Sequence, residues 1–233
     1  MNGHYSIAID GPSGAGKSSL AQRCAKAFGI LYVDTGAIYR TVGLAAYRRG
    51  IDRKDERAIM EMLPELQIGM RYDDSGEQRM YLNGADVSAE IRLPEISICA
   101  SDVSSLPGVR AFLLEMQRQL ARENSVIMDG RDIGTVVLPD ADLKIFLTAS
   151  AAARAERRLK QLAEKGVSAD YEEVLRDIRY RDEQDSGRAA APLKAAEDAV
   201  TMDTTQIDFD GSFALLCRII EERLGVRPEK EGV

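Results

Sequence analysis

Short apolar runs alternate with longer amphipathic stretches along most of the chain. The apolar runs predict strands at 5–10 (YSIAID), 30–34 (ILYVD), 125–129 (SVIMD), 143–147 (LKIFL) and 199–202. The stretches between them carry apolar residues at helical spacing and predict helices at 17–28, 38–49, 52–66, 94–106, 107–123, 150–165, 170–186 and 213–224. Strands that alternate with helices predict an α/β fold, with a mostly parallel sheet covered by helices on both faces.

One region departs from this pattern. Residues 66–72 (LQIGMRY) and 78–82 (QRMYL) alternate in polarity, and the turn-forming segments DDSGE and Asn83-Gly84 follow them. Such alternation with tight turns is typical of antiparallel hairpins. We therefore expect one α/β core with two excursions, a small β insert around 60–102 and a helical, arginine-rich segment around 150–189.

Residues 11–18 (GPSGAGKS) join the first strand to the first helix and match the pattern G-x-x-x-x-G-K-[ST] in full. Glycines let successive backbone N–H groups surround a phosphate, and the following helix directs its positive end at the same anion. We expect Lys17 to contact the β- and γ-phosphates of a nucleoside triphosphate and Ser18 to bind Mg²⁺. The alternative, a glycine-rich turn that happens to contain lysine, does not explain the complete match.

The phosphate loop alone does not distinguish kinases, GTPases and motor-type ATPases. The chain contains no N/T-K-x-D segment of the kind that reads guanine, so a GTPase is a poor fit. Its only histidine, His4, lies near the N-terminus, which argues against a histidine base or a histidine-rich metal site. Phosphoryl transfer needs neither of these, but it does need fixed cations and the exclusion of water.

The net charge of the 233 residues is −7, which argues against a general nucleic-acid binder or a protein of acidic membranes. We see no secretion signal and no run near the roughly 20 apolar residues of a spanning helix. Cys24, Cys99 and Cys217 lie on apolar helical stripes, so we expect buried reduced thiols. These features predict a soluble cytoplasmic protein, and we expect a monomer because no amphipathic stripe is left over.

Arginines gather where nucleotide phosphates would need them. Arg40 follows the second strand, and Arg131 lies between two aspartates at the end of the 125–129 strand, where α/β sheets place ligands. Arg181, Asp185 and Arg188 share one helical face. A second helix carries Arg154, Arg157 and Arg158, for which a solvated charged face is an equally good interpretation.

Asp129 directly follows the apolar run SVIM, a pattern typical of an acid that holds the Mg²⁺ shell through water. The alternative role is that of a loop or helix-capping aspartate. Asp34, also at a strand end, is a weaker candidate.

Several segments together resemble the bacterial cytidylate kinases, which are nucleoside monophosphate kinases. They are IDGPSGAGKS (9–18), DTGAIYR (34–40), DGRDIGTVVLPDA (129–141), KIFLTAS (144–150) and RDEQDSGRAAAPL (181–193). The resemblance runs nearly end to end and implies the reaction ATP + CMP (or dCMP) ⇌ ADP + CDP (or dCDP), with Mg²⁺. It implies a P-loop kinase core (about 1–37, 103–149 and 190–233), a monophosphate-binding subdomain with a three-stranded insert (about 38–102) and a helical lid (about 150–189).

The resemblance also implies roles for individual residues. The catalytic residues are Lys17, Asp129, Arg131 and Arg181. The ATP-binding residues are Gly11, Pro12, Ser13, Gly14, Ala15, Gly16, Lys17, Ser18, Ser19 and Arg157, of which Ser18 binds the metal. The residues for the monophosphate are Thr35, Tyr39, Arg40, Ser101, Arg110, Arg131, Asp132, Arg181, Asp185 and Arg188.

Within the last set, Arg40, Arg131, Arg181 and Arg188 are expected at phosphates and Asp185 at the sugar hydroxyls. Ser101, Arg110 and Asp132 would read the cytosine edge, and Asp132 would reject the carbonyl that uracil presents in place of the amino group. Thr35 stands where the family is expected to have serine, which puts the choice between CMP and dCMP in question.

Two alternatives remain at this stage. The first is another P-loop kinase with a small acceptor, such as a shikimate, uridylate or adenylate kinase, against which the pair Arg110 and Asp132 argues. The second is a sensor that binds ATP without turnover, which leaves the clustered arginines unexplained.

Overall fold

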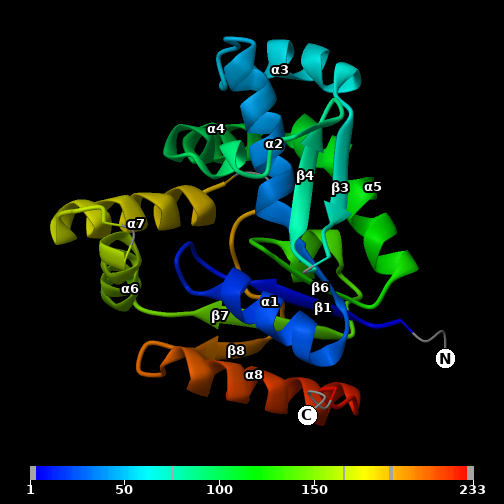
Figure 1. The fold of residues 1–233 in the computed structure, drawn as a ribbon, viewed down its shortest axis with the longest axis vertical. Coiled ribbons are helices and arrows are strands. Elements are labelled where there is room, and N and C mark those ends of the chain that lie inside the picture. Colours follow the sequence, from blue (N-terminus) through cyan, green and yellow to red (C-terminus); the bar gives the residue numbers. More distant parts are fainter. Residues whose placement is uncertain (1–3, 75, 165, 189–190, 230–233) are drawn as a thin grey trace. The chain divides into compact units, whose positions relative to one another are not determined.

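The computed structural model describes residues 4–74, 76–164, 166–188 and 191–229 (Figure 1). The contacts divide the chain into two compact units, Met1–Tyr32 with Asn124–Val233, and Val33–Glu123. We call these the first and the second unit. The expected division into core, monophosphate subdomain and lid stays a prediction.

The main sheet has five strands in the order β2-β6-β1-β7-β8. Their bounds are β1 (Ser6–Asp10), β2 (Leu31–Asp34), β6 (Val126–Gly130), β7 (Leu143–Thr148) and β8 (Val200–Asp203). The central strand β1 pairs in parallel with β6 and β7, and β7 pairs in parallel with β8. The chain runs from β1 toward one edge of the sheet and later crosses to the other, which creates a switch point outside the carboxyl end of β1, where α/β sheets bind ligands.

The first unit also contains helices. They are α1 (Lys17–Phe28), α6 (Ala151–Glu164), α7 (Tyr171–Ser186), α8 (Phe209–Leu224) and the short π-helix η3 (Ile133–Val137). Helices α1 and α8 pack together over the strands, with Leu20, Cys24 and Cys217 in the core beside Ile7 and Ile9. Helices α6 and α7 pack mainly against each other around a small separate cluster (Figure 1).

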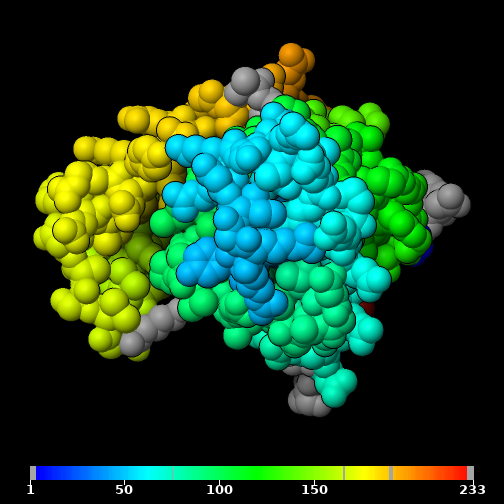
Figure 2. All heavy atoms as spheres, turned by 90° about the horizontal axis from the view of Figure 1, so that it is seen from above, coloured from blue at the N-terminus to red at the C-terminus, as the bar shows by residue number. Residues whose placement is uncertain are grey.

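The second unit combines helices with a small antiparallel sheet in the order β3-β4-β5. Its elements are α2 (Thr35–Arg48), α3 (Glu56–Met62), η1 (Leu63–Glu65), β3 (Ile68–Tyr72), β4 (Gln78–Leu82), β5 (Ala85–Asp86), η2 (Glu90–Arg92), α4 (Pro94–Ser104) and α5 (Pro107–Glu123). Helix α2 packs closely on α4 at Gly43, where an added Cβ would lie 2.9 Å from the backbone nitrogen of Ala100. The face of this unit formed by the end of α2 and by α3 is turned to the viewer in Figure 2.

The expected α/β class, with a parallel sheet flanked by helices and a small antiparallel insert, is confirmed. The Asn83-Gly84 turn joins β4 to β5 as predicted, with Leu82 paired to Ala85. Two helices begin earlier than the apolar pattern indicated, because an aspartate caps each: Asp34 accepts a bond from the Ala37 nitrogen at 2.9 Å, and Asp208 accepts one from Gly211 at 2.8 Å.

The π-helix η3 was not predicted. The three cysteines are free and buried, as expected. No helix in the described part of the chain combines the length and the apolar character needed to cross a membrane.

Candidate active site

The phosphate loop connects β1 to α1 in the first unit. Position 11 has no room for a side chain, because a Cβ there would lie 1.9 Å from the carbonyl oxygen of Leu147. The φ of Gly11 is 151°. Gly14 and Gly16 also have positive φ values, of 75° and 91°. Because Gly16 at the N-cap position has no side chain, the first amides of α1 are left to bind an anion. The loop therefore has the backbone that the motif predicts.

Lys17 is 5% exposed, and its Nζ donates a hydrogen bond to the carbonyl oxygen of Pro12 at 2.8 Å. Burial and, to a smaller extent, the nearby Arg131 guanidinium lower the pKa of Lys17 to about 7, although Asp129, Asp10 and Asp185 oppose the shift. The neighbouring carboxylates thus do not fully compensate the positive charge of Lys17, and an anion such as phosphate would compensate it.

Ser18, Asp129 and Tyr32 form one hydrogen-bonded group at the start of α1. The Ser18 hydroxyl donates to Oδ2 of Asp129 at 2.7 Å, and the Tyr32 hydroxyl donates to Oδ1 at 2.9 Å. Asp129 is 5% exposed, and Tyr32 is buried as well. A hydroxyl beside a carboxylate is an all-oxygen donor set, which suits Mg²⁺.

Arg131 and Arg188, which are predicted to bind phosphate, both contact Asp185, which is predicted to bind the sugar hydroxyls. Arg131 donates from Nε to Oδ2 of Asp185 at 2.6 Å, and Arg188 donates to Oδ1 of the same carboxylate. Asp185 is 5% exposed, and its carboxylate lies between two guanidinium groups and reduces the repulsion between them. Arg181, expected on the same helical face, is exposed.

Arg154 has a role that sequence reasoning left open. It is 4% exposed, and its guanidinium donates to the carbonyl oxygens of Ala149 and Ser13, each at 2.9 Å. It also forms a two-pronged pair with Asp182 of α7, at 2.9 and 2.6 Å. Arg154 therefore links the phosphate loop, the end of β7 and α7, and the solvated interpretation is wrong for this residue.

Arg157, expected at ATP, is half-buried in the same helix. Its guanidinium donates to the carbonyl oxygens of Thr204 and Ile207, with the latter contact at 3.3 Å. It thereby ties α6 to the loop after β8. That loop lies in the same unit as the phosphate loop.

A second missed residue is Asp10, the last residue of β1. It is 4% exposed, and its two carboxylate oxygens accept hydrogen bonds from the backbone nitrogens of Ile133 and Gly134, each at 2.7 Å. The only sequence signal was an acidic side chain at the carboxyl end of a buried strand. Asp132, the expected base reader, directly precedes these two amides and is 4% exposed.

The second unit holds the remaining predicted residues. Arg40 donates to Oδ2 of Asp34 at 2.7 Å, while its Nε is buried and lacks a hydrogen-bond partner within the described residues. The β insert braces this pair, since the Gln78 side chain bonds both the nitrogen and the carbonyl oxygen of Asp34, at 2.8 and 3.2 Å. A buried guanidinium N–H without an acceptor is suited to an anionic ligand.

The other acceptor residues lie on α2, α4 and the start of α5. The Arg110 guanidinium lies 5.6 Å from the ring centroid of Tyr39 and donates to the Ser104 carbonyl at 3.1 Å. Thr35 is buried, and Ser101 is half-buried. The second unit thus brings Tyr39 and Arg110 together, and their roles toward the monophosphate stay predictions.

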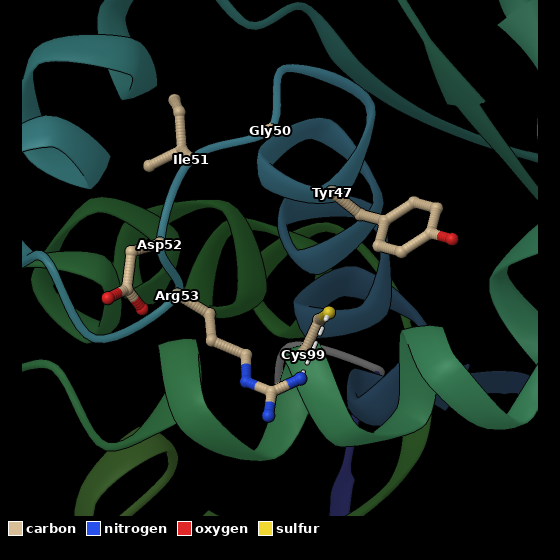
Figure 3. A pocket seen from close by; sticks show the side chains of 6 residues that line it. All are labelled: Tyr47, Gly50, Ile51, Asp52, Arg53 and Cys99. Carbon is tan, nitrogen blue, oxygen red and sulfur yellow. Dashed lines mark hydrogen bonds between the residues drawn. The ribbon is translucent and has the colours of Figure 1, made fainter.

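One cavity of about 440 Å³ lies at the opposite end of α2 in the second unit (Figure 3). Its lining residues are Tyr47, Gly50, Ile51, Asp52, Arg53 and Cys99. Arg53 points across it, with Nη1 4.0 Å from the Cys99 sulfur and Nε 2.5 Å from Asp102. None of the residues expected to bind nucleotide lines this cavity.

A parallel sheet that carries a complete phosphate loop, with a hydroxyl–carboxylate pair beside its lysine, defines the class of P-loop nucleotide-binding proteins. The family model for cytidylate kinases matches residues 7–222. The chain belongs to the cytidylate kinase family, and the resemblance drawn from the sequence is confirmed.

Individual relatives agree with this assignment. The chain is 46% identical over 223 residues to a cytidylate kinase from Lactobacillus johnsonii, covering 96% of each chain. It is 49% identical over 219 residues to one from a Geobacter species, covering 94% of this chain and 93% of the relative. Among solved structures, an uncharacterized protein from Eubacterium ventriosum matches with a TM-score of 0.51 at 14% identity, over 94% of this chain and 100% of that one, which shows the fold alone.

Proposed function

We propose that this protein is an ATP-dependent cytidylate kinase that transfers the γ-phosphoryl group of ATP to CMP or dCMP, giving CDP or dCDP. The observation that carries the proposal is the family match over nearly the whole chain, together with an intact phosphate loop. The arrangement of charges supports the same chemistry, because the acceptor phosphate is already an anion and needs alignment and neutralisation more than a base.

The donor side is built from the phosphate loop. Backbone amides of the loop and of α1 would hold the phosphates of ATP, and Lys17 would contact their oxygens and regain its full positive charge. Ser18 and Asp129 would hold Mg²⁺, Ser18 directly and Asp129 through water. The ion would neutralise charge on the phosphates and help to orient them.

For the acceptor side, each unit carries its own candidate cations and polar groups. Arg40 would bind the phosphate of CMP through its buried Nε, and Thr35 and Tyr39 would line the same pocket. Arg131, Arg181 and Arg188 would neutralise the transferring phosphoryl group, while Asp185 would bind the sugar hydroxyls. In the free protein Asp185 keeps Arg131 and Arg188 adjacent despite their like charge.

Selection of the base is proposed to depend on Ser101, Arg110 and Asp132. Cytosine offers an amino donor beside two acceptors, and this pattern suits a carboxylate beside a hydroxyl and a guanidinium. Uracil would direct a carbonyl oxygen at Asp132 and leave a buried carboxylate without its donor.

The first test is ADP production from Mg·ATP with CMP, dCMP, UMP, AMP, GMP and shikimate offered separately. We expect turnover with CMP and dCMP, and we expect Asp132→Asn to lose the preference for cytosine while it still binds ATP. Turnover led by another acceptor would overturn the assigned base-reading roles. ATP binding without turnover on any acceptor would favour the sensor instead.

We further propose a monomeric, cytoplasmic enzyme. Light scattering coupled to size-exclusion chromatography tests the oligomeric state, and a dimer at micromolar concentration would contradict it. Fractionation of cells that express the chain tests its location.

A further inference from the structure

Asp10 is a buried carboxylate that the proposed chemistry does not use directly. It ends β1 immediately before the phosphate loop, and it is 4% exposed. Both of its oxygens accept hydrogen bonds at 2.7 Å, one from the backbone nitrogen of Ile133 and one from that of Gly134. Because both contacts are short and buried, they fix the position of two successive peptide groups.

These two peptide groups begin the π-helix η3. The amides at the start of a helix have no acceptor within the helix, so an external oxygen must satisfy them. Further along, the nitrogens of Val136 and Val137 donate back to the Asp132 carbonyl, at 2.9 and 3.2 Å. Asp132, at the N-cap position, has φ −147° and ψ 29° and makes no side-chain capping bond, so its carboxylate does not cap η3. Asp10 takes over the capping of η3.

Asp10 accepts two amide bonds best as a carboxylate, because protonation turns one of its oxygens into a donor. The pKa of Asp10 is raised to about 6, mainly by burial; the bonds from Gly134 and Ile133 and the charge of Lys17 oppose this rise, and the charge of Asp132 adds to it. The side chain is therefore ionised at pH 7 and above. An amide in its place would direct an N–H donor at a backbone N–H donor.

We propose that Asp10 is a positioning residue for base selection, which holds the start of η3 so that the Asp132 carboxylate is presented to the acceptor base. The inference rests on the proposed function, in which Asp132 reads cytosine. It extends that function to a residue outside the base pocket. A carboxylate that must distinguish an amino group from a carbonyl oxygen needs a fixed backbone, since a small displacement loses the hydrogen bond that rejects uracil.

The competing interpretation is that Asp10 only stabilises the end of β1. The two interpretations differ in one measurable quantity, the ratio of kcat/KM for CMP to kcat/KM for UMP. Loss of stability or weaker ATP binding affects both acceptors alike and cancels in this ratio. Displacement of the Asp132 carboxylate, in contrast, lowers the ratio of kcat/KM for CMP to that for UMP.

The main variant is Asp10→Asn, matched by Asp142→Asn at the opposite end of β1. Asp142 is likewise a carboxylate that receives a strand amide, from Ser6 at 2.8 Å, and it also accepts the Ser6 hydroxyl at 3.1 Å. We expect the CMP-to-UMP ratio to fall at least tenfold in Asp10→Asn and to stay within twofold of the unmodified protein in Asp142→Asn. An unchanged ratio in Asp10→Asn overturns the inference.

Gly134→Ala provides a second route if Asp10→Asn does not fold. Its Cβ would stand 3.1 Å from Cδ of Lys144 and 3.4 Å from Oδ2 of Asp10, so the start of η3 or the Lys144 side chain must shift by a few tenths of an ångström, while residue 10 keeps its carboxylate. We expect a lower ratio here as well, and an unchanged ratio counts against the inference.

Asp132→Asn separates failure of this inference from failure of the proposed function. If Asp132→Asn keeps the original ratio, Asp132 is not the base reader, and the inference falls with that role. If the CMP-to-UMP ratio falls in Asp132→Asn but is unchanged in a folded Asp10→Asn, then Asp132 does read the base and only the inference about Asp10 is wrong.

Discussion

The pair formed by Arg154 and Asp182 offers a quantitative test of how the phosphate loop is tied to α7. The Arg154 side chain is 4% exposed and that of Asp182 is 29% exposed, and their two contacts measure 2.9 and 2.6 Å. Two parallel charge-assisted bonds with limited access to water should couple the residues by about 2 kcal/mol. Arg154→Met keeps the packing of the stem, and Asp182→Ala removes the acceptor.

The chain contains a matched control in Arg57 and Glu61, an i,i+4 pair on α3 at 3.0 Å whose side chains are 89% and 67% exposed. A pair this exposed should couple by only about 0.3–0.5 kcal/mol, because water and salt screen it. The assay is urea unfolding of the two single variants and the double variant for each pair, analysed as a double-mutant cycle. A coupling for Arg154 and Asp182 no larger than that of the control would refute the reasoning.

The same variants separate stability from nucleotide binding. Arg154→Met also removes the donor to the carbonyl oxygen of Ser13 in the phosphate loop, whereas Asp182→Ala leaves that bond in place. We therefore expect a several-fold loss of ATP affinity in Arg154→Met and less than a twofold loss in Asp182→Ala. Equal losses would mean that the ion pair, and not the contact with the loop, supports ATP binding.

Three further predictions follow from buried contacts. The pKa of Lys17 is lowered from 10.5 to about 7, mainly by burial. Between these two pH values the unfolded chain binds a proton that the folded protein lacks, so the free energy of unfolding increases as the pH rises. Lys17→Met should raise the melting temperature of the nucleotide-free protein more at pH 6 than at pH 9 and abolish stabilisation by ATP; an equal rise at both values would contradict the shift. Gly43→Ala places a Cβ 2.9 Å from the backbone nitrogen of Ala100 and should cost about 1–3 kcal/mol in urea unfolding, whereas no loss would mean that α2 and α4 separate freely. Tyr32→Phe removes a 2.9 Å bond to Asp129 and should raise the Mg²⁺ concentration for half-maximal activity about tenfold; unchanged Mg²⁺ dependence would place the metal elsewhere.

Features encoded in short segments could be predicted from the sequence. The phosphate loop is one, because a buried strand, three glycines, a lysine and a helix follow one another within residues 6–28. The Asn83-Gly84 turn is another, because both residues adopt the positive φ that this tight turn requires, 52° and 83°. Family membership could also be identified, because several specific motifs occur in order along the chain.

Helix starts were predicted less well than strands. The apolar pattern marks where a helix is buried, whereas its first residue depends on which side chain caps it. Asp34 and Asp208 cap α2 and α8 ahead of the first apolar positions and thereby lengthen both helices.

By itself, the sequence determined the class of fold, the position of the phosphate loop and the family, because each depends on local pattern. Only the tertiary structure decided what the charged side chains contact. Asp10 meets Ile133 across 123 positions of the chain, and Ser18 meets Asp129 across 111. Composition and helical spacing cannot tell a solvated arginine from a buried one, so the burial of Arg154 could not be predicted. The pairing of strands brings distant loops to one edge of the sheet, and burial there gives each charge its partner and its strength.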